Sequence, residues 1–158
     1  MRTGNLRYQS GFGYLLVLFA VSALGLLAAG AGQVWRSTAQ REREAELLFV
    51  GHQYRKAIES YQSVNFNGQH QWPARLEDLL EDRRLPTVRR HLRRLYRDPM
   101  TENGAWVLVK SGEHIIGVHT AVHTATFRKH FEGEDAAFNG TSSCDDWVFI
   151  ARQQEAAK

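Results

Sequence analysis

The stretch Phe12–Gly32, FGYLLVLFAVSALGLLAAGAG, holds 21 residues without one charged side chain. About 20 consecutive apolar residues are enough for an α-helix to cross a lipid bilayer. The mean hydropathy of the whole chain is −0.42 despite this run, so the remaining sequence is hydrophilic. A buried core helix is the alternative, but such helices rarely run this far without a charge. The stretch therefore predicts a membrane-spanning helix over 12–32, anchored by five bulky side chains: Phe12, Leu16, Leu18, Leu24 and Leu27.

Two interpretations of this membrane segment remain open. It can be a cleaved secretory signal peptide, with Arg2 and Arg7 in its basic start and Ala29–Ala31 as a small-residue cleavage site. It can also be retained as an anchor. The run exceeds the roughly 7–15 apolar residues of a signal peptide, and bases flank it on both sides, so charge does not orient it. Its length favours the retained anchor.

The residues after the anchor continue the helix. Val34–Tyr61 contains no proline and one glycine, Gly51. Its apolar residues recur every three or four positions, the spacing of one helix face: Leu47, Val50, Tyr54, Ala57 or Ile58, and Tyr61. We expect one helix from about Phe12 to Tyr61, whose 33–62 portion is amphipathic and packs on a small domain. A cleaved signal peptide has no need of such a continuation, which again favours retention.

Two short helices are expected early in the remaining segment, 63–158. A loop rich in asparagine and glycine, Ser63–His70, ends the long helix. Trp72-Pro73 opens the first short helix. Thr87 can cap the second, which would run to Tyr96. Their expected buried residues are leucines and one valine: Leu76, Leu79 and Leu80 in the first helix, and Val88, Leu92 and Leu95 in the second.

Strands follow a turn at Asp98–Gly104, whose Asp-Pro start and Asn-Gly end favour a chain reversal. β-branched and aromatic residues then predict three strands: Ala105–Lys110, Ile115–Thr120 and Trp147–Ala151. The first two are joined by a hairpin loop, Ser111–His114. The predicted fold class is α+β, with the long helix packed on a small antiparallel sheet.

Positive charge is concentrated in one short segment. The chain carries 20 Lys and Arg against 17 Asp and Glu, a net +3. Residues 83–97 hold seven arginines and no acid, whereas 33–82 sum to −2 and 98–158 to −4. Nucleic-acid binding is not expected, because Tyr96 alone is interleaved with these arginines and no nucleic-acid fold motif accompanies them. Four of the arginines form a candidate partner-binding cluster: Arg89, Arg90, Arg93 and Arg94.

The arginine segment also has simpler interpretations. It can be a solvated face neutralised by the neighbouring Glu81, Asp82 and Asp98, or by the acidic C-terminal third. It can also bind lipid head groups. A contact with another protein or subunit is the main functional alternative to neutralisation within the molecule.

Motifs along most of the chain carry a resemblance to a known family. The apolar run opens with Ser10–Leu16, SGFGYLL, directly after a short basic leader. Three groups follow in order: Trp72-Pro73 with Leu76–Leu80, Asp98–Thr101 with Trp106, and Gly112 with Ile116–Val118 and Trp147. With this order the chain resembles the type IV pilin-like family and, more narrowly, a pseudopilin of bacterial type II secretion.

The resemblance implies a processing site, a location and partners. A prepilin peptidase would cut between Gly11 and Phe12 on the cytoplasmic side, removing the leader 1–11 and leaving Phe12 as a new N-terminus that can be methylated. The chain would be a single-pass protein of the bacterial inner membrane, with its N-terminus cytoplasmic and 63–158 as a periplasmic pilin-like head. It would assemble with other pseudopilin or pilin subunits and with inner-membrane secretion components.

One position departs from the family's pattern. The fifth mature position is usually Glu, which pairs with the N-terminal amine of a neighbouring subunit, and here it is Leu16. A charge inside lipid is costly and is kept for a partner. Its absence points away from a major shaft subunit and toward a tip or minor subunit, an atypical member, or a chain whose leader stays uncut.

Other polar clusters give weaker candidates. His119 and His123 would lie roughly 13 Å apart along a strand, too far to share a metal. Cys144 is the single cysteine, and no nucleophile motif surrounds it. Five carboxylates have the chemistry of calcium ligands, and the resemblance implies a calcium loop about here, but their spacing matches no regular loop: Glu132, Glu134, Asp135, Asp145 and Asp146. We expect no metal, no cofactor and no enzyme activity.

A second class of function stays open. The chain can be a membrane-anchored or secreted periplasmic binding module that uses the arginine cluster for an anionic partner. The mature N-terminus separates the two hypotheses, because a start at Phe12 indicates prepilin processing and a start at Gly32 indicates a secreted module.

Overall fold

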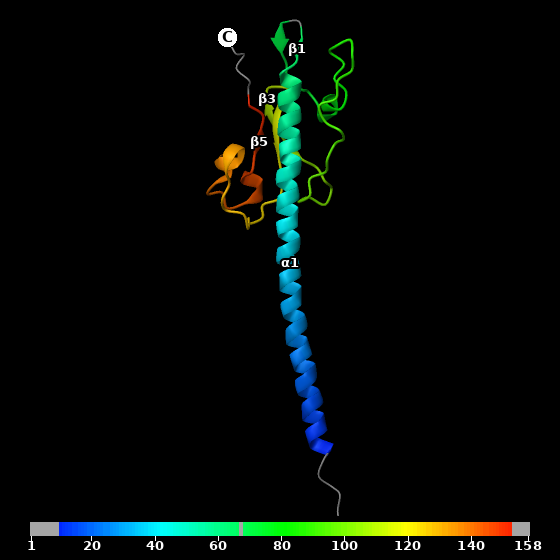
Figure 1. Cartoon of the computed structure of the whole chain (residues 1–158), viewed down its shortest axis with the longest axis vertical. Helices are drawn as coiled ribbons and strands as arrows, with labels where there is room; N and C mark the ends of the chain where they lie inside the picture. Colours follow the sequence, from blue (N-terminus) through cyan, green and yellow to red (C-terminus); the bar gives the residue numbers. More distant parts are fainter. Residues whose placement is uncertain (1–9, 67, 153–158) are drawn as a thin grey trace, which may run out of the picture. The chain divides into compact units, whose positions relative to one another are not determined.

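The computed structural model describes residues 10–66 and 68–152, apart from the side chains at positions 10, 11 and 27–34. In this part of the chain, one long helix, α1 (Ser10–Gln62), precedes two small antiparallel sheets and three short 3₁₀-helices (Figure 1). The chain divides into two units, residues 1–40 and residues 41–158, and α1 contributes to both. The predicted α+β class is confirmed.

The first unit contains the N-terminal part of α1. The helix starts at Ser10, two residues before the predicted start. Its described large apolar side chains are exposed: Phe12, Tyr14, Leu15, Leu16, Val17, Leu18, Phe19, Val21, Leu24 and Leu26. Among the residues that the structure describes, no helix combines the length and the apolar character that crossing a membrane requires.

In the second unit, α1 forms one wall of the hydrophobic core. The apolar stripe predicted from the sequence is buried: Leu47, Val50, Tyr54, Ala57, Ile58 and Tyr61. Tyr54 is fixed by a hydrogen bond from its Oη to the carbonyl of Tyr96, at 2.8 Å. Burial raises the pKa of Tyr54 to about 12. The stripe thus confirms the amphipathic part of the predicted long helix.

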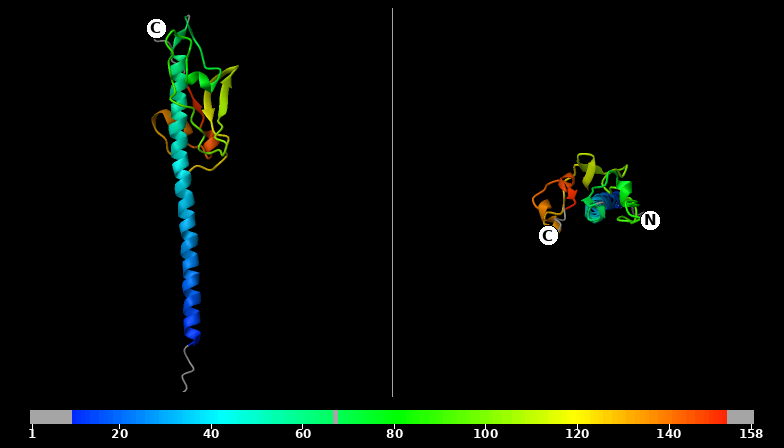
Figure 2. Two further views of the ribbon diagram at one scale, coloured as in Figure 1. Left: turned by 90° about the vertical axis from the view of Figure 1, so that its right-hand side faces the viewer. Right: turned by 90° about the horizontal axis from the view of Figure 1, so that it is seen from above.

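A three-stranded antiparallel sheet lies beside this part of α1 (Figure 2). Its strands, in spatial order, are β3 (Val107–Ser111), β4 (His114–His119) and β5 (Phe149–Ile150). They fall within one or two residues of the predicted strands. The β3–β4 turn contains Gly112 with a φ of +61°, a left-handed conformation that favours glycine.

The helix and the sheet approach closely at Gly51. A Cβ atom at this position would overlap the ring of Phe149, which is fully buried. The ring of Phe149 meets Phe138 edge-on, and Trp147 packs against Phe138 and Phe131 in the same core. A glycine in the middle of α1 is therefore explained by packing rather than by flexibility.

The predicted helix from Thr87 to Tyr96 is wrong, since the structure has no helix there. Of its three expected core residues, Leu92 is buried, whereas Val88 and Leu95 are exposed. A helix would place Arg89 beside Arg93, four positions apart, and like charges at that spacing repel. The chain here instead has an irregular conformation held by backbone hydrogen bonds to Leu79 and Asp82.

The other connections contain short elements that the sequence did not predict in full. The loop Ser63–His70 includes a small hairpin, and a single 3₁₀ turn stands where the first short helix was expected. Two more 3₁₀-helices lie in the stretch expected to be loop. These elements are β1 (Asn65–Phe66), β2 (Gln69–His70), η1 (Leu76–Leu79), η2 (Gly133–Phe138) and η3 (Cys144–Asp146).

Candidate functional site

The arginine segment 83–97 is an irregular strap held to the domain by its backbone. The N–H groups of His91 and Leu92 both donate to the carbonyl of Leu79, each at 2.9 Å. Asp82 and Arg89 exchange two backbone hydrogen bonds, at 2.8 and 3.2 Å. With the Leu92 side chain buried, these bonds fix the strap without a helix.

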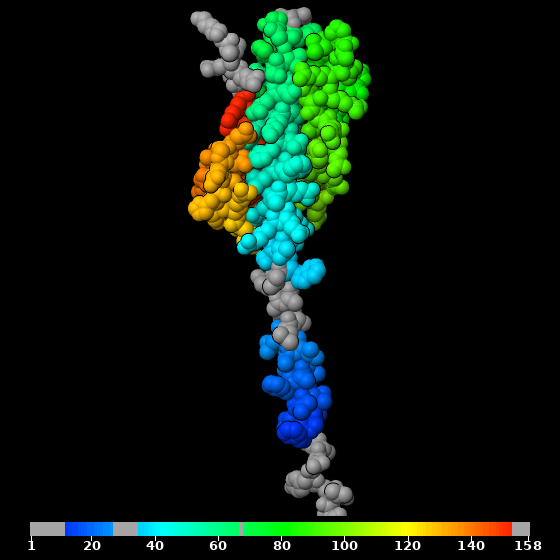
Figure 3. Space-filling model, viewed as in Figure 1, coloured from blue at the N-terminus to red at the C-terminus, as the bar shows by residue number. Residues whose placement is uncertain are grey.

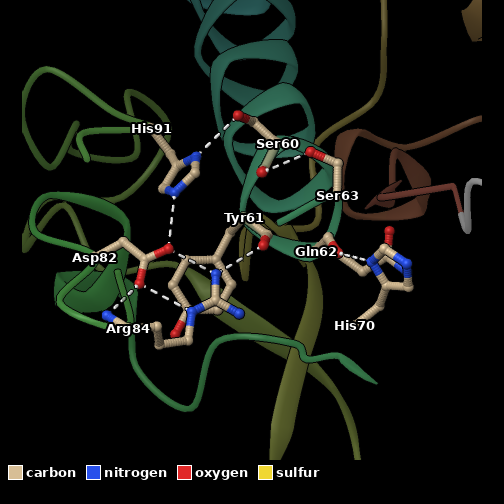
Figure 4. Close-up of polar contacts among 8 residues, drawn as sticks. All are labelled: Ser60, Tyr61, Gln62, Ser63, His70, Asp82, Arg84 and His91. Atoms are coloured by element: carbon tan, nitrogen blue, oxygen red, sulfur yellow. Dashed lines mark hydrogen bonds and ion pairs between the residues drawn. The ribbon is translucent and has the colours of Figure 1, made fainter. Parts of the chain in front are cut away.

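A buried carboxylate anchors the start of the strap (Figure 4). The Asp82 side chain is fully buried and accepts hydrogen bonds from Arg84 Nε at 2.8 Å and Nη2 at 2.6 Å. Arg84 Nη2 also donates to the carbonyl of Tyr61 at 2.8 Å, and its guanidinium lies 3.6 Å above the Tyr61 ring. The guanidinium holds the pKa of Asp82 well below its usual range, against the opposing effect of burial. This ion pair fastens the strap to the end of α1.

His91 completes the cluster from the other side of Asp82 (Figure 4). Its buried ring places Nε2 3.2 Å from Asp82 Oδ2 and Nδ1 2.8 Å from Ser60 Oγ. A neutral imidazole satisfies both partners when Nε2–H donates to the carboxylate and Nδ1 accepts from the hydroxyl. Burial lowers the pKa of His91, although Asp82 opposes this effect. The neutral form is therefore the one that fits the folded state.

We expect acid to destabilise the domain through His91. An unfolded histidine titrates near pH 6.5, whereas the buried ring has a lowered pKa. The unfolded chain then binds more protons, so the free energy of unfolding falls as the pH drops below about 6.5. In urea titrations of the full chain, His91→Gln should flatten this decline, and His114→Gln, at an exposed position, should not. An unchanged slope in His91→Gln would contradict the assignment.

Part of the arginine charge is neutralised within the molecule. Arg84 pairs with Asp82, and Arg83 Nη2 lies 2.6 Å from Glu81 Oε2 at the surface. Asp98, also considered as a neutralising group, instead accepts a hydrogen bond from the backbone N–H of Met100 at 2.8 Å. The neutralisation hypothesis therefore applies to the first two arginines of the segment.

The four arginines predicted to bind a partner, Arg89, Arg90, Arg93 and Arg94, are all exposed. Within the described residues, none of the four forms an ion pair of 4 Å or less. The Arg94 guanidinium lies 5.0 Å from the centre of the Tyr96 ring. The positive charge of these four side chains therefore faces the solvent.

Of the five acidic residues considered as possible calcium ligands, three pair with basic side chains. Asp135 Oδ1 lies 2.7 Å from His52 Nε2 and 3.4 Å from Arg55 Nη1. Glu134 faces the same arginine at 3.7 Å. Asp145 pairs with His123 at 3.1 Å. Among residues 10–66 and 68–152, no three His, Cys, Asp or Glu side chains are grouped to hold a metal.

Sequence reasoning missed His52 and Arg55 as partners of the acidic segment. Arg55 is buried on α1 and packs its guanidinium near Phe149, at 5.5 Å. In the sequence, Arg55 stands next to Tyr54 of the core-facing stripe. This position indicates a buried charge, and a buried charge needs a partner. Its partner Asp135 is 80 positions away, and the sequence alone does not identify it.

Cys144 has no nucleophilic character in this fold. Its side chain is fully buried, and burial raises the pKa of the thiol to about 12. The thiolate is the reactive form of cysteine, so this group stays protonated at neutral pH.

The proposed processing site lies at the start of α1. Gly11 and Phe12 both belong to the helix, and Phe12 is exposed. The leader residues 1–9 lie outside the described part of the chain, as does the Leu27 side chain. The other anchor residues, Leu16, Leu18 and Leu24, are exposed.

Comparison with known proteins adds no relative: no family model, no curated protein and no solved structure matches this chain.

Proposed function

We propose that the chain is a non-enzymatic, membrane-anchored, pseudopilin-like subunit of a type II secretion or type IV pilus-like filament. A prepilin peptidase removes its leader between Gly11 and Phe12. The helix segment 12–32 then anchors the subunit in the bacterial inner membrane, with residues 63–158 in the periplasm.

The observation that carries this proposal is the apolar surface at the start of α1. Phe12 and Phe19 are 76% and 77% exposed, and the large apolar residues between them are also exposed. Such a surface is unfavourable in water, by about 25 cal/mol for each Å². Soluble monomers rarely expose a contiguous apolar patch of this kind, whereas lipid or neighbouring apolar helices would cover it.

The second unit is consistent with this role. One apolar stripe of α1 packs on a small antiparallel sheet, the arrangement that the resemblance implies. Two pairs of titratable side chains contact each other inside the domain: His52 with Asp135, and His91 with Asp82. Leu16 is 57% exposed, which suits contact with lipid and supplies no carboxylate for a neighbouring amine. A tip, minor or atypical subunit therefore fits better than a major one.

A periplasmic binding module is the second candidate. The observation in its favour is the exposed charge of Arg89, Arg90, Arg93 and Arg94. A module of this kind would use the four guanidinium groups for an anionic partner and would need no prepilin processing.

Substitution at Gly11 tests the proposed processing directly. Co-expressed with a prepilin peptidase, the wild-type chain should lose its 11-residue leader, and Gly11→Val should stay uncut because a bulky side chain replaces the residue before the cut. A mass shift on intact protein reports the cleavage. Gly25→Ala, at a helix glycine with nothing within 4 Å of an added Cβ, is the matched control and should be cut. Equal processing of Gly11→Val and wild type would count against the proposal.

A further inference from the structure

We propose that the chain binds a second copy of itself head to tail, through complementary charge on two faces of its second unit. The arginine face comprises Arg89, Arg90, Arg93 and Arg94. The acidic face comprises Glu132, Glu134 and Asp146. This contact deepens the filament function proposed above and rests on it for its setting.

The arginine face carries charge that the molecule itself does not neutralise. Residues 83–97 hold seven arginines and no acid, and the ion pairs inside the domain account for Arg83 and Arg84. The backbone bonds of His91 and Leu92 to Leu79 hold this part of the strap in place. The face therefore presents several positive groups from a fixed backbone, which lowers the ordering cost of a contact.

The acidic face comes from η2, with Glu132 directly before it, and from η3. Residues 129–146 contain one lysine and five acids. Asp135 is taken up by His52 and Arg55, and the Lys129 ammonium donates to Thr126 Oγ1 at 3.2 Å. The three members of the face are exposed: Glu132, Glu134 and Asp146. Glu134 lies 3.7 Å from Arg55 Nη1, whereas Glu132 and Asp146 form no ion pair of 4 Å or less within the described residues.

The two faces lie on opposite sides of α1. The green strap that contains the arginine face is on one side of the helix, and the orange segment that contains the acidic face is on the other (Figure 3). The view from above agrees with this placement (Figure 2). Because α1 stands between them, the two faces cannot neutralise each other within one copy, but they can do so between copies.

This geometry predicts a contact that repeats. Each copy offers two different faces, so the interface is heterologous and leaves one free face at each end of a pair. Such contacts close into rings or continue as helical filaments. Among the three kinds of subunit proposed above, an atypical subunit that assembles with its own copies needs the second outcome. The same chain supplies both the four arginines and three exposed carboxylates that can face them, which favours a second copy over an anionic lipid or a nucleic acid as the occupant of the arginine face.

Paired charge reversals test the contact in the full chain. One variant, Arg89→Glu/Arg90→Glu/Arg93→Glu, carries net negative charge on both faces, and the other, Glu132→Arg/Glu134→Arg, carries net positive charge on both faces. In detergent solution, each variant alone should self-associate about tenfold more weakly than wild type, since attraction between exposed pairs becomes repulsion. An equal mixture of the two should recover the association. Lys56→Glu/Lys110→Glu, which reverses two exposed charges elsewhere, should associate like wild type.

Cross-linking identifies the atoms in contact. A carbodiimide joins lysine amines to carboxylates but does not join arginine. Arg89→Lys/Arg90→Lys/Arg93→Lys/Arg94→Lys keeps the charge and should gain cross-links to Glu132 or Glu134. Mixing this variant with isotope-labelled wild-type chain shows by mass whether each new link joins two copies, and the number of links should fall as salt rises.

Three outcomes would contradict the proposed contact. In the first, the variants self-associate as strongly as wild type; in the second, the mixture of variants does not recover self-association. In the third, the arginine face binds anionic vesicles or duplex DNA without affecting self-association. The filament function is judged separately by the mature N-terminus. A chain cut at Phe12 with no pairing in the mixture removes the contact alone, and an uncut chain whose mixture pairs removes the filament function alone.

Discussion

Replacing Asp82 with alanine should lower the free energy of unfolding of the second unit by about 3–5 kcal/mol. The carboxylate is fully buried, and its partner Arg84 is only 11% exposed, so the variant leaves a guanidinium buried without its counter-ion. The same change removes the acceptor for His91 Nε2 and for the backbone N–H of Arg84. Urea unfolding of the full chain in detergent, followed by near-UV circular dichroism, measures the loss.

Two matched variants distinguish the effect of leaving a buried charge unpaired from the effect of removing charge in general. Glu81→Ala breaks the neighbouring surface pair with Arg83, whose members are 46% and 78% exposed, and should cost far less than Asp82→Ala because solvent screens an exposed pair. Asp82→Leu/Arg84→Met removes both buried charges and should cost less than Asp82→Ala, because no charge is left unpaired. A loss below about 1 kcal/mol in Asp82→Ala would show that this cluster does not hold the strap.

Replacing Trp147 with alanine should cost about 3–5 kcal/mol. The side chain is fully buried, with its ring centre 5.3 Å from that of Phe131 and 6.2 Å from that of Phe138. Truncation leaves a cavity in this aromatic cluster, and it also removes the hydrogen bond from Trp147 Nε1 to Thr141 Oγ1, at 3.0 Å. The midpoint and slope of urea unfolding report the change.

Other substitutions make the Trp147 result specific. Trp147→Phe keeps an aromatic ring and should cost clearly less than Trp147→Ala, since the cavity is smaller. Trp35→Ala, at a site 79% exposed in the first unit, should leave the unfolding of the second unit unchanged. Equal stability of Trp147→Ala and Trp35→Ala would contradict the assigned core.

The long helix and most of the sheet were predictable because each follows a regular period. The spacing of three and four from Leu47 to Tyr61 marked the buried stripe of α1, and the β-branched runs marked β3 and β4. The helix predicted for segment 87–96 was wrong because the leucines there have helical spacing while the arginines oppose a helix. The 3₁₀-helices near the C-terminus have no period to detect.

The candidate site was predictable in composition but not in geometry. The sequence identifies Arg89 and Arg90 as part of a dense positive cluster, and both are exposed. It does not show that His91, between arginines, turns inward to Asp82 and Ser60. Such contacts depend on how the strap crosses the end of α1, which is a tertiary property without a local pattern.

The mass of the mature N-terminus shows whether the leader is removed as proposed. We expect a bacterial host with a prepilin peptidase to yield a chain that begins at Phe12, with the 11 leader residues removed. Intact-protein and peptide mass spectrometry of the membrane fraction measures this, and methylation at Phe12 would strengthen the result. A chain that begins at Met1 or at Gly32 would contradict the account, the first by lacking prepilin processing and the second by losing the anchor.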